Sequence, residues 1–245
     1  GEEALLRRIA DTCRNVSPSP KIVILNFPHN PTTRTVELGF FEEIVRLAKR
    51  YGFYVIQDFA YGMTTFDGYK APSFLQAAGA KDVGVETLTM SKGFNMAGWR
   101  VGFVVGNPDM VKLLSAIKGY YDYGIFQAIQ IATVIALRHA VGEMEDQAKV
   151  YQARRDLLVD GLTRAGWEVD PCRATMFLWA RLPPAWRAMG SIEFSMQCLQ
   201  KAEGALAPGR GFGEDGEEYV RIALVENEER LRQAVRQIRR AFPVL

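Results

Sequence analysis

Apolar residues recur along the first part of the chain with the spacings of two helices and two strands. Residues 2–14 and 36–51 each place their apolar side chains on one side of a helix, and Gly52 follows at a helix-ending position. Residues 21–27 form a near-continuous apolar run, typical of a parallel strand covered on both faces, and residues 53–57 form a second, shorter run. Because crossover connections are right-handed, strand, helix and strand in this order predict a parallel pair.

The pattern continues with two further strands and two further helices. Residues 83–90 and 101–105 are predicted strands. Asn107 follows as a predicted N-cap, with a proline at the first helical turn. Residues 125–139 and 144–162 have helical periodicity. Alternating strands and helices of this kind predict an α/β fold with a mainly parallel sheet between helices.

From Trp167 the character of the chain changes to short strands and helices, and Gly142, between the two predicted helices that precede it, is a plausible hinge. Beyond it, residues 174–180 and 218–224 are predicted strands and residues 228–242 a closing amphipathic helix. We therefore expect a larger α/β domain at residues 1–142 and a smaller α+β domain at residues 143–245.

Composition and charge narrow the class of protein. The chain has 245 residues, 48% hydrophobic and 24% charged, which is ordinary globular composition. Its 30 basic and 28 acidic residues give a net charge of +2, so no electrostatic field favours nucleic acid or an anionic membrane. No apolar run is long enough to span a bilayer, and residues 1–8 are unlike a signal peptide, so we expect a cytoplasmic protein.

The three cysteines, Cys13, Cys172 and Cys198, are odd in number and widely spaced. This spacing favours neither a disulfide framework nor a zinc site. We expect buried, unreactive thiols and no metal centre.

Candidate functional side chains follow the ends of the predicted strands. Asn30 follows the first strand, Asp58 follows the second with Tyr61 three residues later, and Lys92 follows the third with Arg100 eight residues on. Open α/β sheets bind ligands at the carboxyl ends of their strands. An amide, a carboxylate, a phenol, an amine and a guanidinium there suit a cofactor with a phosphate, a phenolic oxygen, a ring nitrogen and an aldehyde.

The order Asn-Pro, Asp-x-x-Tyr, Ser-Lys, Arg and then a late Arg in a strand resembles the fold-type I pyridoxal-phosphate aminotransferases of class I/II. The resemblance runs from about Lys21 through Arg221 to the last helix and is nearest to the alanine and LL-diaminopimelate aminotransferases. It implies pyridoxal 5'-phosphate as cofactor and a homodimer with sites at the subunit boundary. Since family members carry a substantial portion ahead of the first helix predicted here, we expect this chain to be a fragment.

By this resemblance Lys92 is the catalytic residue, which holds the cofactor as a Schiff base and then moves a proton at the substrate's α-carbon. Asp58 is expected to keep the pyridine nitrogen protonated. Each has a simpler interpretation. A lone lysine at a strand end is usually solvated, and an aspartate after a strand can cap a helix.

The resemblance assigns the other cofactor contacts to four side chains. Asn30 and Tyr61 are expected at the phenolic oxygen, although Asn30 also suits a turn. Arg100 matches the phosphate-binding arginine, with Ser91 as a hydroxyl donor beside it.

Arg221 lies among apolar residues of a predicted strand, where a cation is costly without an anion. The resemblance supplies the substrate α-carboxylate as that anion, and a salt bridge with a nearby acid is the alternative. Thr33 stands where relatives commonly have glycine, and residues 211–216 are expected to form a flexible loop despite their dinucleotide-like glycine spacing.

The sequence thus predicts an aminotransferase that acts on an amino acid and a 2-oxo acid. A β-lyase on the same scaffold shares every residue named and differs in releasing ammonia. From another class, the chain could be an inactive fragment or a cofactor-binding module. Residues 119–127 contain no arginine that could hold a second carboxylate, so small neutral substrates such as alanine are favoured.

Overall fold

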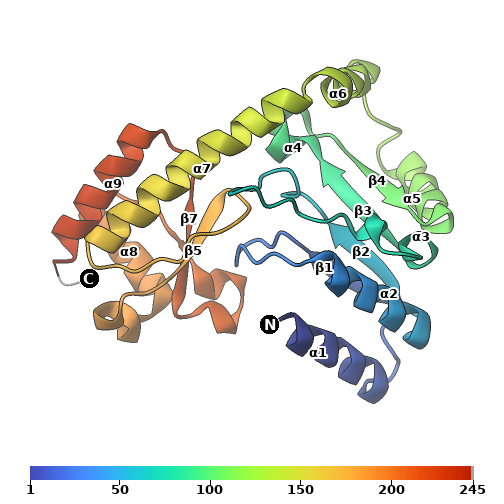
Figure 1. Cartoon of the computed structure of the whole chain (residues 1–245), viewed down its shortest axis with the longest axis horizontal. Helices are drawn as coiled ribbons and strands as arrows, with labels where there is room; N and C mark the ends of the chain where they lie inside the picture. Colours follow the sequence, from blue (N-terminus) through green and yellow to red (C-terminus); the bar gives the residue numbers. More distant parts are fainter. Residues whose placement is uncertain (244–245) are drawn as a thin grey trace. The chain divides into compact units, whose positions relative to one another are not determined.

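A computed structural model describes residues 1–243 (Figure 1). The chain divides into two compact units that each draw on separate stretches of sequence. The first unit consists of Gly1–Pro28, Thr35–Met63 and Lys70–Glu145, and the second of His29–Arg34, Thr64–Tyr69 and the chain from Asp146 onward. The division of the protein into a domain at residues 1–142 and a domain at residues 143–245 stays a prediction.

The first unit is built on a four-stranded sheet with the order β1-β2-β3-β4. The strands are β1 (Ile22–Asn26), β2 (Tyr54–Asp58), β3 (Gly84–Thr89) and β4 (Gly102–Gly106). The first three are parallel and β4 is antiparallel to β3. The predicted mixed, mainly parallel α/β sheet is confirmed.

Helices α1 (Glu2–Asn15) and α2 (Leu38–Tyr51) share one apolar core with β1 and β2. Gly52 ends α2 in the left-handed region, at φ 72°, and its N–H donates to Ala48 O at 2.8 Å. The next helices along the chain are α3 (Ala80–Val83), α4 (Met90–Gly93), α5 (Pro108–Tyr121) and α6 (Gln127–His139). Helix α7 (Val141–Arg164) begins in the first unit and continues into the second.

The structure covers β1 on one face only, so the prediction of a strand covered on both faces is wrong for the described residues. Leu25 is 5% exposed, whereas its neighbour Ile24 is 72% exposed. Ile22 pairs in register with Tyr54, and both are exposed on the same face as Ile24. An apolar run shows that both faces of the strand could be buried, but it does not show that another element covers each face. No element within residues 1–243 covers the face at Ile24.

The predicted N-cap of α5 is confirmed. The Asn107 side-chain oxygen accepts hydrogen bonds from the backbone N–H groups of Asp109 and Met110, at 3.1 and 3.0 Å. Because Pro108 has no N–H, this side chain satisfies the next two backbone donors at the helix start.

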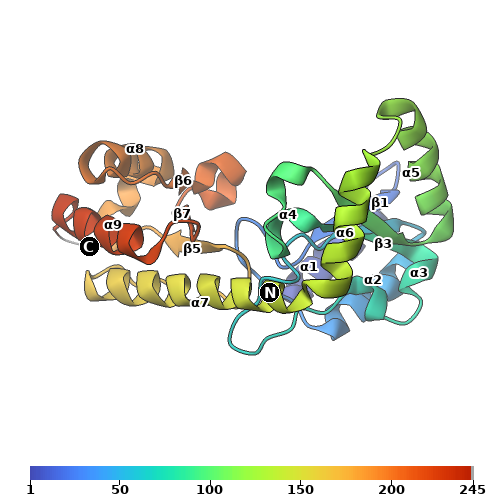
Figure 2. The same ribbon diagram turned by 90° about the horizontal axis from the view of Figure 1, so that it is seen from above.

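The described part of the second unit contains a three-stranded antiparallel sheet and three α-helical segments. Strand β7 (Tyr219–Ala223) lies between β5 (Phe177–Arg181) and β6 (Ala207–Pro208). Figure 2 shows α8 (Gly190–Ala202), α9 (Glu228–Ala241) and α7 around these strands, and all three helices contribute side chains to one apolar core. The predicted small α+β character of this part of the chain is confirmed.

Two short segments, residues 29–34 and 64–69, belong to the second unit although the residues on either side of them belong to the first. In residues 64–69, Phe66 N donates to Arg173 O at 2.8 Å. Thr175 N in turn donates to Thr64 O at 2.8 Å. These bonds continue the backbone pairing of a bridge between Thr65 and Ala174.

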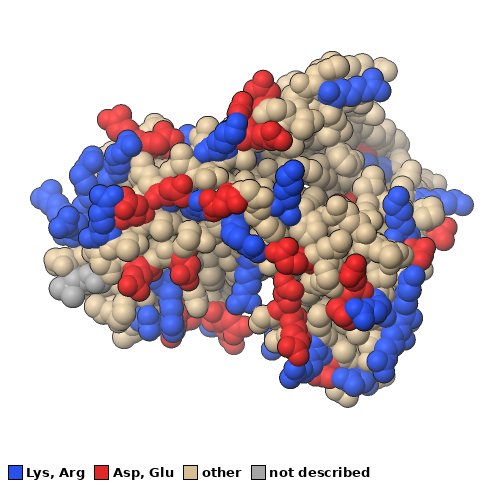
Figure 3. Space-filling model, viewed as in Figure 1, with Lys and Arg blue, Asp and Glu red and all other residues tan. Residues whose placement is uncertain are grey.

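Surface charge and thiol burial agree with the composition. Figure 3 shows basic and acidic side chains interspersed on the face that it draws. Cys13, Cys172 and Cys198 are buried free thiols, as expected. Within residues 1–243, no helix combines the length and apolarity needed to cross a membrane.

Candidate active site

Three strand ends meet at one edge of the sheet in the first unit. Asp58, the last residue of β2, pairs in register with Asn26 on β1 and Thr87 on β3. The Asn26 amide nitrogen donates to Asp58 O at 3.0 Å. This is the carboxyl edge of the parallel strands, where the ligand site of an open α/β sheet lies.

Asp58 closes a turn and does not cap a helix. Its half-buried carboxylate accepts a hydrogen bond from Ala60 N at 3.1 Å. Phe59 N donates to Thr87 O at 2.9 Å, so the turn leaves the sheet beside β3. The turn bond leaves the carboxylate with further acceptor capacity, since an ionised carboxylate offers about four lone-pair positions.

Lys92 lies on the short helix α4, which begins directly after β3. Thr89 caps this helix, because its hydroxyl oxygen accepts from Ser91 N at 3.1 Å. The same hydroxyl donates to Ser91 Oγ at 2.9 Å. Lys92 Nζ is 6.0 Å from the ring centroid of Tyr61, a buried side chain of the segment that follows Asp58. The amine and the phenol predicted from sequence therefore lie close together.

Gly93 explains how α4 approaches that segment. A Cβ at this position would lie 3.1 Å from the Cβ of Met63 and 3.2 Å from the sulfur of Met144. Both distances are shorter than ordinary van der Waals contact. A side chain here would force Met63 and Met144 to shift by a few tenths of an ångström, so glycine favours the close approach of α4 to the Tyr61 segment.

Arg100 is held by a compact loop at the surface of the first unit. Met90 N donates to Val101 O at 3.2 Å, which closes the loop between α4 and β4. Arg100 adopts a left-handed conformation with φ 51°, which is uncommon for a residue other than glycine. Its Nη1 donates to Ala97 O at 3.1 Å, and the side chain also lines a cavity of about 550 Å³ that includes Lys118 and Ser115.

Arg221 and Asn30 lie together in the second unit. Arg221 Nη1 donates to Asn30 Oδ1 at 2.8 Å. The guanidinium carbon lies 4.3 Å from the ring centroid of Phe177 and 4.7 Å from that of Phe212. The arginine predicted to bind substrate and the amide predicted to bind cofactor are thus direct neighbours.

Neither phenylalanine is among the site residues predicted from the sequence. Phe177 begins β5, and Phe212 ends a short 3-10 turn, Gly209–Phe212, inside the stretch expected to be a flexible loop. Residues 209–212 and 214–216 form two hydrogen-bonded 3-10 turns, so the stretch is structured locally, and its flexibility stays a prediction. The sequence did contain one indication of Phe212. It is an aromatic residue in a glycine-rich stretch, shortly before the strand that contains Arg221.

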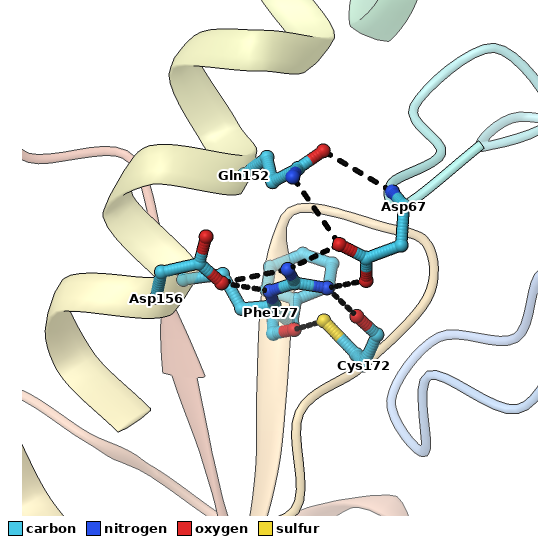
Figure 4. Close-up of polar contacts among 6 residues, drawn as sticks. Asp67, Gln152, Asp156, Cys172 and Phe177 are labelled. Atoms are coloured by element: carbon cyan, nitrogen blue, oxygen red, sulfur yellow. Dashed lines mark hydrogen bonds and ion pairs between the residues drawn. The ribbon is translucent and has the colours of Figure 1, made fainter. Parts of the chain in front are cut away.

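A buried arginine of α7 was also missed. Arg155 is 3% exposed, and its guanidinium contacts both carboxylate oxygens of Asp67, at 2.5 and 2.9 Å (Figure 4). Its Nη1 donates to Cys172 O at 2.7 Å, and its Nε donates to Asp156 at 2.8 Å. Figure 4 also shows Gln152 bonded to Asp67 through both its amide atoms. We call these five residues the Arg155 cluster.

The spacing of residues along α7 could have indicated that Arg155 is buried. Arg155 lies on the same face of α7 as three buried residues, Tyr151, Leu158 and Leu162. A charged residue on an apolar helix face needs a buried partner.

The electrostatics of the Arg155 cluster follow from these contacts. The hydrogen bond from Arg155 lowers the pKa of the Asp67 carboxyl. Burial raises the pKa of the Cys172 thiol to about 12, which keeps it protonated and unreactive at neutral pH.

The side chains of the first unit match the chemistry of pyridoxal phosphate. An amine, a carboxylate and a phenol, Lys92, Asp58 and Tyr61, lie at the carboxyl edge of its sheet. A hydroxyl and a guanidinium, Ser91 and Arg100, lie on the segment that joins β3 to β4. This donor set suits an aldehyde, a ring nitrogen, a phenolic oxygen and a phosphate, so the residues present fit the cofactor.

Comparison with known proteins identifies a family. The model of the family described as aminotransferase class I and II matches residues 3–238. The chain is 49% identical over 229 residues to glutamate-pyruvate aminotransferase AlaC of Escherichia coli, which covers 94% of this chain and 56% of that protein. It is 42% identical over 228 residues to LL-diaminopimelate aminotransferase of Moorella thermoacetica, covering 93% of this chain and 58% of that protein.

Solved structures agree with this assignment. An aminotransferase from Staphylococcus aureus superposes with a TM-score of 0.85 and 35% identity, covering 91% of this chain and 58% of that one. The chain therefore spans somewhat more than half the length of the relatives it matches.

Proposed function

Because the chain belongs to the aminotransferase class I and II family, we propose that the protein moves an amino group between an amino acid and a 2-oxo acid. Enzymes of this family use pyridoxal 5'-phosphate. The observation that carries the proposal is the position of Lys92, one turn beyond the carboxyl edge of the sheet and close to Tyr61, with Asp58 on the neighbouring strand.

Lys92 is the residue to which we assign the central chemistry. When bound, pyridoxal phosphate supplies a ring that withdraws electrons from the substrate's α-carbon. The Lys92 amine would attach the cofactor and, once displaced by the substrate amine, remove the proton from the α-carbon. Its place at the C-terminal end of a one-turn helix, capped by Thr89, limits the positions that Nζ can reach.

The neighbouring side chains of the first unit hold and tune the cofactor in this proposal. Asp58 keeps a proton on the ring nitrogen, because an ionised carboxylate favours the charged form of its partner. Tyr61 would donate a hydrogen bond to the cofactor's phenolic oxygen. Ser91 and Arg100 bind the phosphate, for which the planar fork of arginine is well suited.

Two side chains of the second unit complete the proposed set. Asn30 uses its carbonyl oxygen to accept from Arg221, and an amide nitrogen carries two further donors, which we assign to the cofactor's phenolic oxygen. Arg221 is assigned to the substrate α-carboxylate, which a guanidinium can bind through two parallel hydrogen bonds.

We favour small neutral amino donors such as alanine. The stretch from Gly119 to Gln127 contains tyrosines and one aspartate but no arginine that could hold a second carboxylate. The E. coli relative is named as a glutamate-pyruvate aminotransferase, which is in line with an alanine product or donor.

A homodimer is part of the proposal. Several large apolar side chains of α5, α6 and the loop between them are more than half exposed, which is unusual for a monomer surface. They include Leu113, Ile117, Phe126, Ile131 and Ile135. A cytoplasmic location stays a prediction from the sequence.

Product analysis tests the function. Incubation of the protein with L-alanine, 2-oxoglutarate and pyridoxal phosphate should yield pyruvate and glutamate in equal amounts. Ammonia release without glutamate would indicate the β-lyase, which the names of the matched relatives do not favour. Cofactor binding without either product would indicate an inactive fragment or a cofactor-binding module.

A further inference from the structure

The guanidinium of Arg221 is flanked by aromatic rings from two different segments of the second unit. Arg221 on β7 pairs in register with Trp179 on β5, so the two side chains lie on one face of the sheet. Phe177, two residues before Trp179, shares that face and places its ring 4.3 Å from the guanidinium carbon. Phe212 arrives from the segment before β7 and places its ring at 4.7 Å.

Close backbone approaches fix the segment that carries Phe212. A Cβ at Gly209 would lie 2.2 Å from Gly216 O, and a Cβ at Gly216 would lie 2.1 Å from Gly209 O. Only glycine therefore allows the two ends of the segment to touch. Gly213, at φ 128°, directs the chain after Phe212 in a conformation that other residues rarely adopt.

The Phe212 ring is further supported by aromatic contacts. It packs edge-on against Trp179, with centroids 6.0 Å apart, and Trp179 stacks on Tyr219 at 5.3 Å. Phe212 is nevertheless 44% exposed, so part of its ring faces solvent beside Arg221.

The Arg155 cluster fixes the other ring through its backbone. Cys172 Sγ donates to Phe177 O at 3.1 Å, and Cys172 O accepts from buried Arg155 at 2.7 Å (Figure 4). The start of β5, which presents the Phe177 ring to Arg221, is thereby tied to a buried ion-pair network.

We propose that Phe177 and Phe212 are positioning residues that hold the Arg221 guanidinium ready for the carboxylate of the amino acid. This proposal rests on the proposed function, in which Arg221 binds that carboxylate. A carboxylate is bound through two parallel hydrogen bonds only when the guanidinium plane is correctly oriented. Aromatic rings attract a guanidinium and restrict its plane, so the ordering of a long, flexible side chain is completed before the substrate arrives.

Phe212→Leu tests the proposal, because leucine keeps apolar bulk and removes the ring. We expect KM for every amino donor to rise about 5- to 30-fold, the range that corresponds to an interaction of about 1–2 kcal/mol, with kcat changed less than about 2-fold. Binding of 2-methylalanine, which has no α-proton, should weaken by the same factor when followed through cofactor absorbance. Phe212→Tyr keeps the ring and should behave like the unaltered protein.

Two further variants make the test decisive. Phe177→Leu should reproduce the Phe212→Leu effect, and Leu199→Ala, which shortens an exposed side chain of α8, should change neither constant. In an Arg221→Gln background, Phe212→Leu should have no further effect, because its target is already removed.

The two proposals fail in different ways. If Arg221→Gln itself leaves binding of 2-methylalanine unchanged, Arg221 is not the carboxylate anchor, and both proposals are overturned. If Arg221→Gln weakens binding but Phe212→Leu and Phe177→Leu bind normally, only the positioning role is overturned. An equal effect of Phe212→Leu with and without Arg221 also overturns it.

Discussion

Arg155 and Asp67, 88 positions apart in the sequence, are joined by two hydrogen bonds between the guanidinium and both carboxylate oxygens, at 2.5 and 2.9 Å. The Arg155 side chain is 4% exposed and that of Asp67 is 50% exposed. The pair ties residues 64–69, which follow the Tyr61 segment in the chain, to helix α7. Its loss should therefore affect the stability of the second unit.

Asp67→Ala should lower the free energy of unfolding by about 1–3 kcal/mol, because it leaves a buried guanidinium with fewer partners. Asp160→Ala is a matched control, since Asp160 pairs with the exposed Arg164 of the same helix and its loss should cost no more than about 0.5 kcal/mol. Urea unfolding of both variants provides the measurement. Equal losses would show that burial of Arg155 contributes nothing.

Asp67 also predicts how stability depends on pH. Arg155 holds the pKa of Asp67 below its ordinary value of about 3.9, so the folded protein retains the charged carboxylate to lower pH than the unfolded chain does. The stabilisation is fully present above about pH 4 and is lost as the pH falls through the folded pKa. The stability difference between the unaltered protein and Asp67→Asn should therefore shrink as the pH falls below about 4, and a constant difference would contradict this.

Thr33 occupies the left-handed region at φ 57°, where a β-branched residue is strained. The substitution Thr33→Gly should raise the free energy of unfolding by about 0.5–1 kcal/mol, after the entropy of the added glycine is subtracted. Thr32→Gly is the control, because Thr32 shares a 2.6 Å hydrogen bond with His29 and its loss should destabilise. Stabilisation by both substitutions would mean that strain at Thr33 is not the cause.

Asp58→Asn should leave folding nearly unchanged, because an amide can still accept the bond from Ala60 N. Removal of the charge should lower the rate of transamination about 10²- to 10³-fold, the usual effect of deleting one electrostatic contact in an active site. Steady-state kinetics with alanine and 2-oxoglutarate measure the rate. Asp82→Asn, an exposed residue paired with Lys49, should have no effect on it. Turnover equal to that of the unaltered protein would show that Asp58 only closes a turn and does not act on the cofactor.

The sequence predicted the parts of this structure that depend on local pattern. The unit from β1 through α2 to β2 follows from apolar periodicity and a glycine stop, and the N-cap at Asn107 follows from residue type. The candidate site residues Asp58 and Lys92 were placed correctly for the same reason, because each lies at or just after the end of a predicted strand.

Features that depend on contacts between distant segments could not be read from pattern alone. The pairing of Asp67 with Arg155 joins two segments that show no shared local signal, and Phe212 lies in a stretch whose glycines indicated a loop. The exposed face at Ile24 was missed because an apolar strand indicates what it can bury and not what covers it.

A labelling experiment tests directly whether Lys92 carries the cofactor. The protein is incubated with pyridoxal phosphate, reduced with borohydride, digested and mapped by mass spectrometry. We predict a pyridoxyl group on the peptide that contains Lys92, and no such label in a Lys92→Ala variant. A label on another lysine, such as Lys118 beside the cavity that Arg100 lines, or equal labelling of both proteins, would contradict the account.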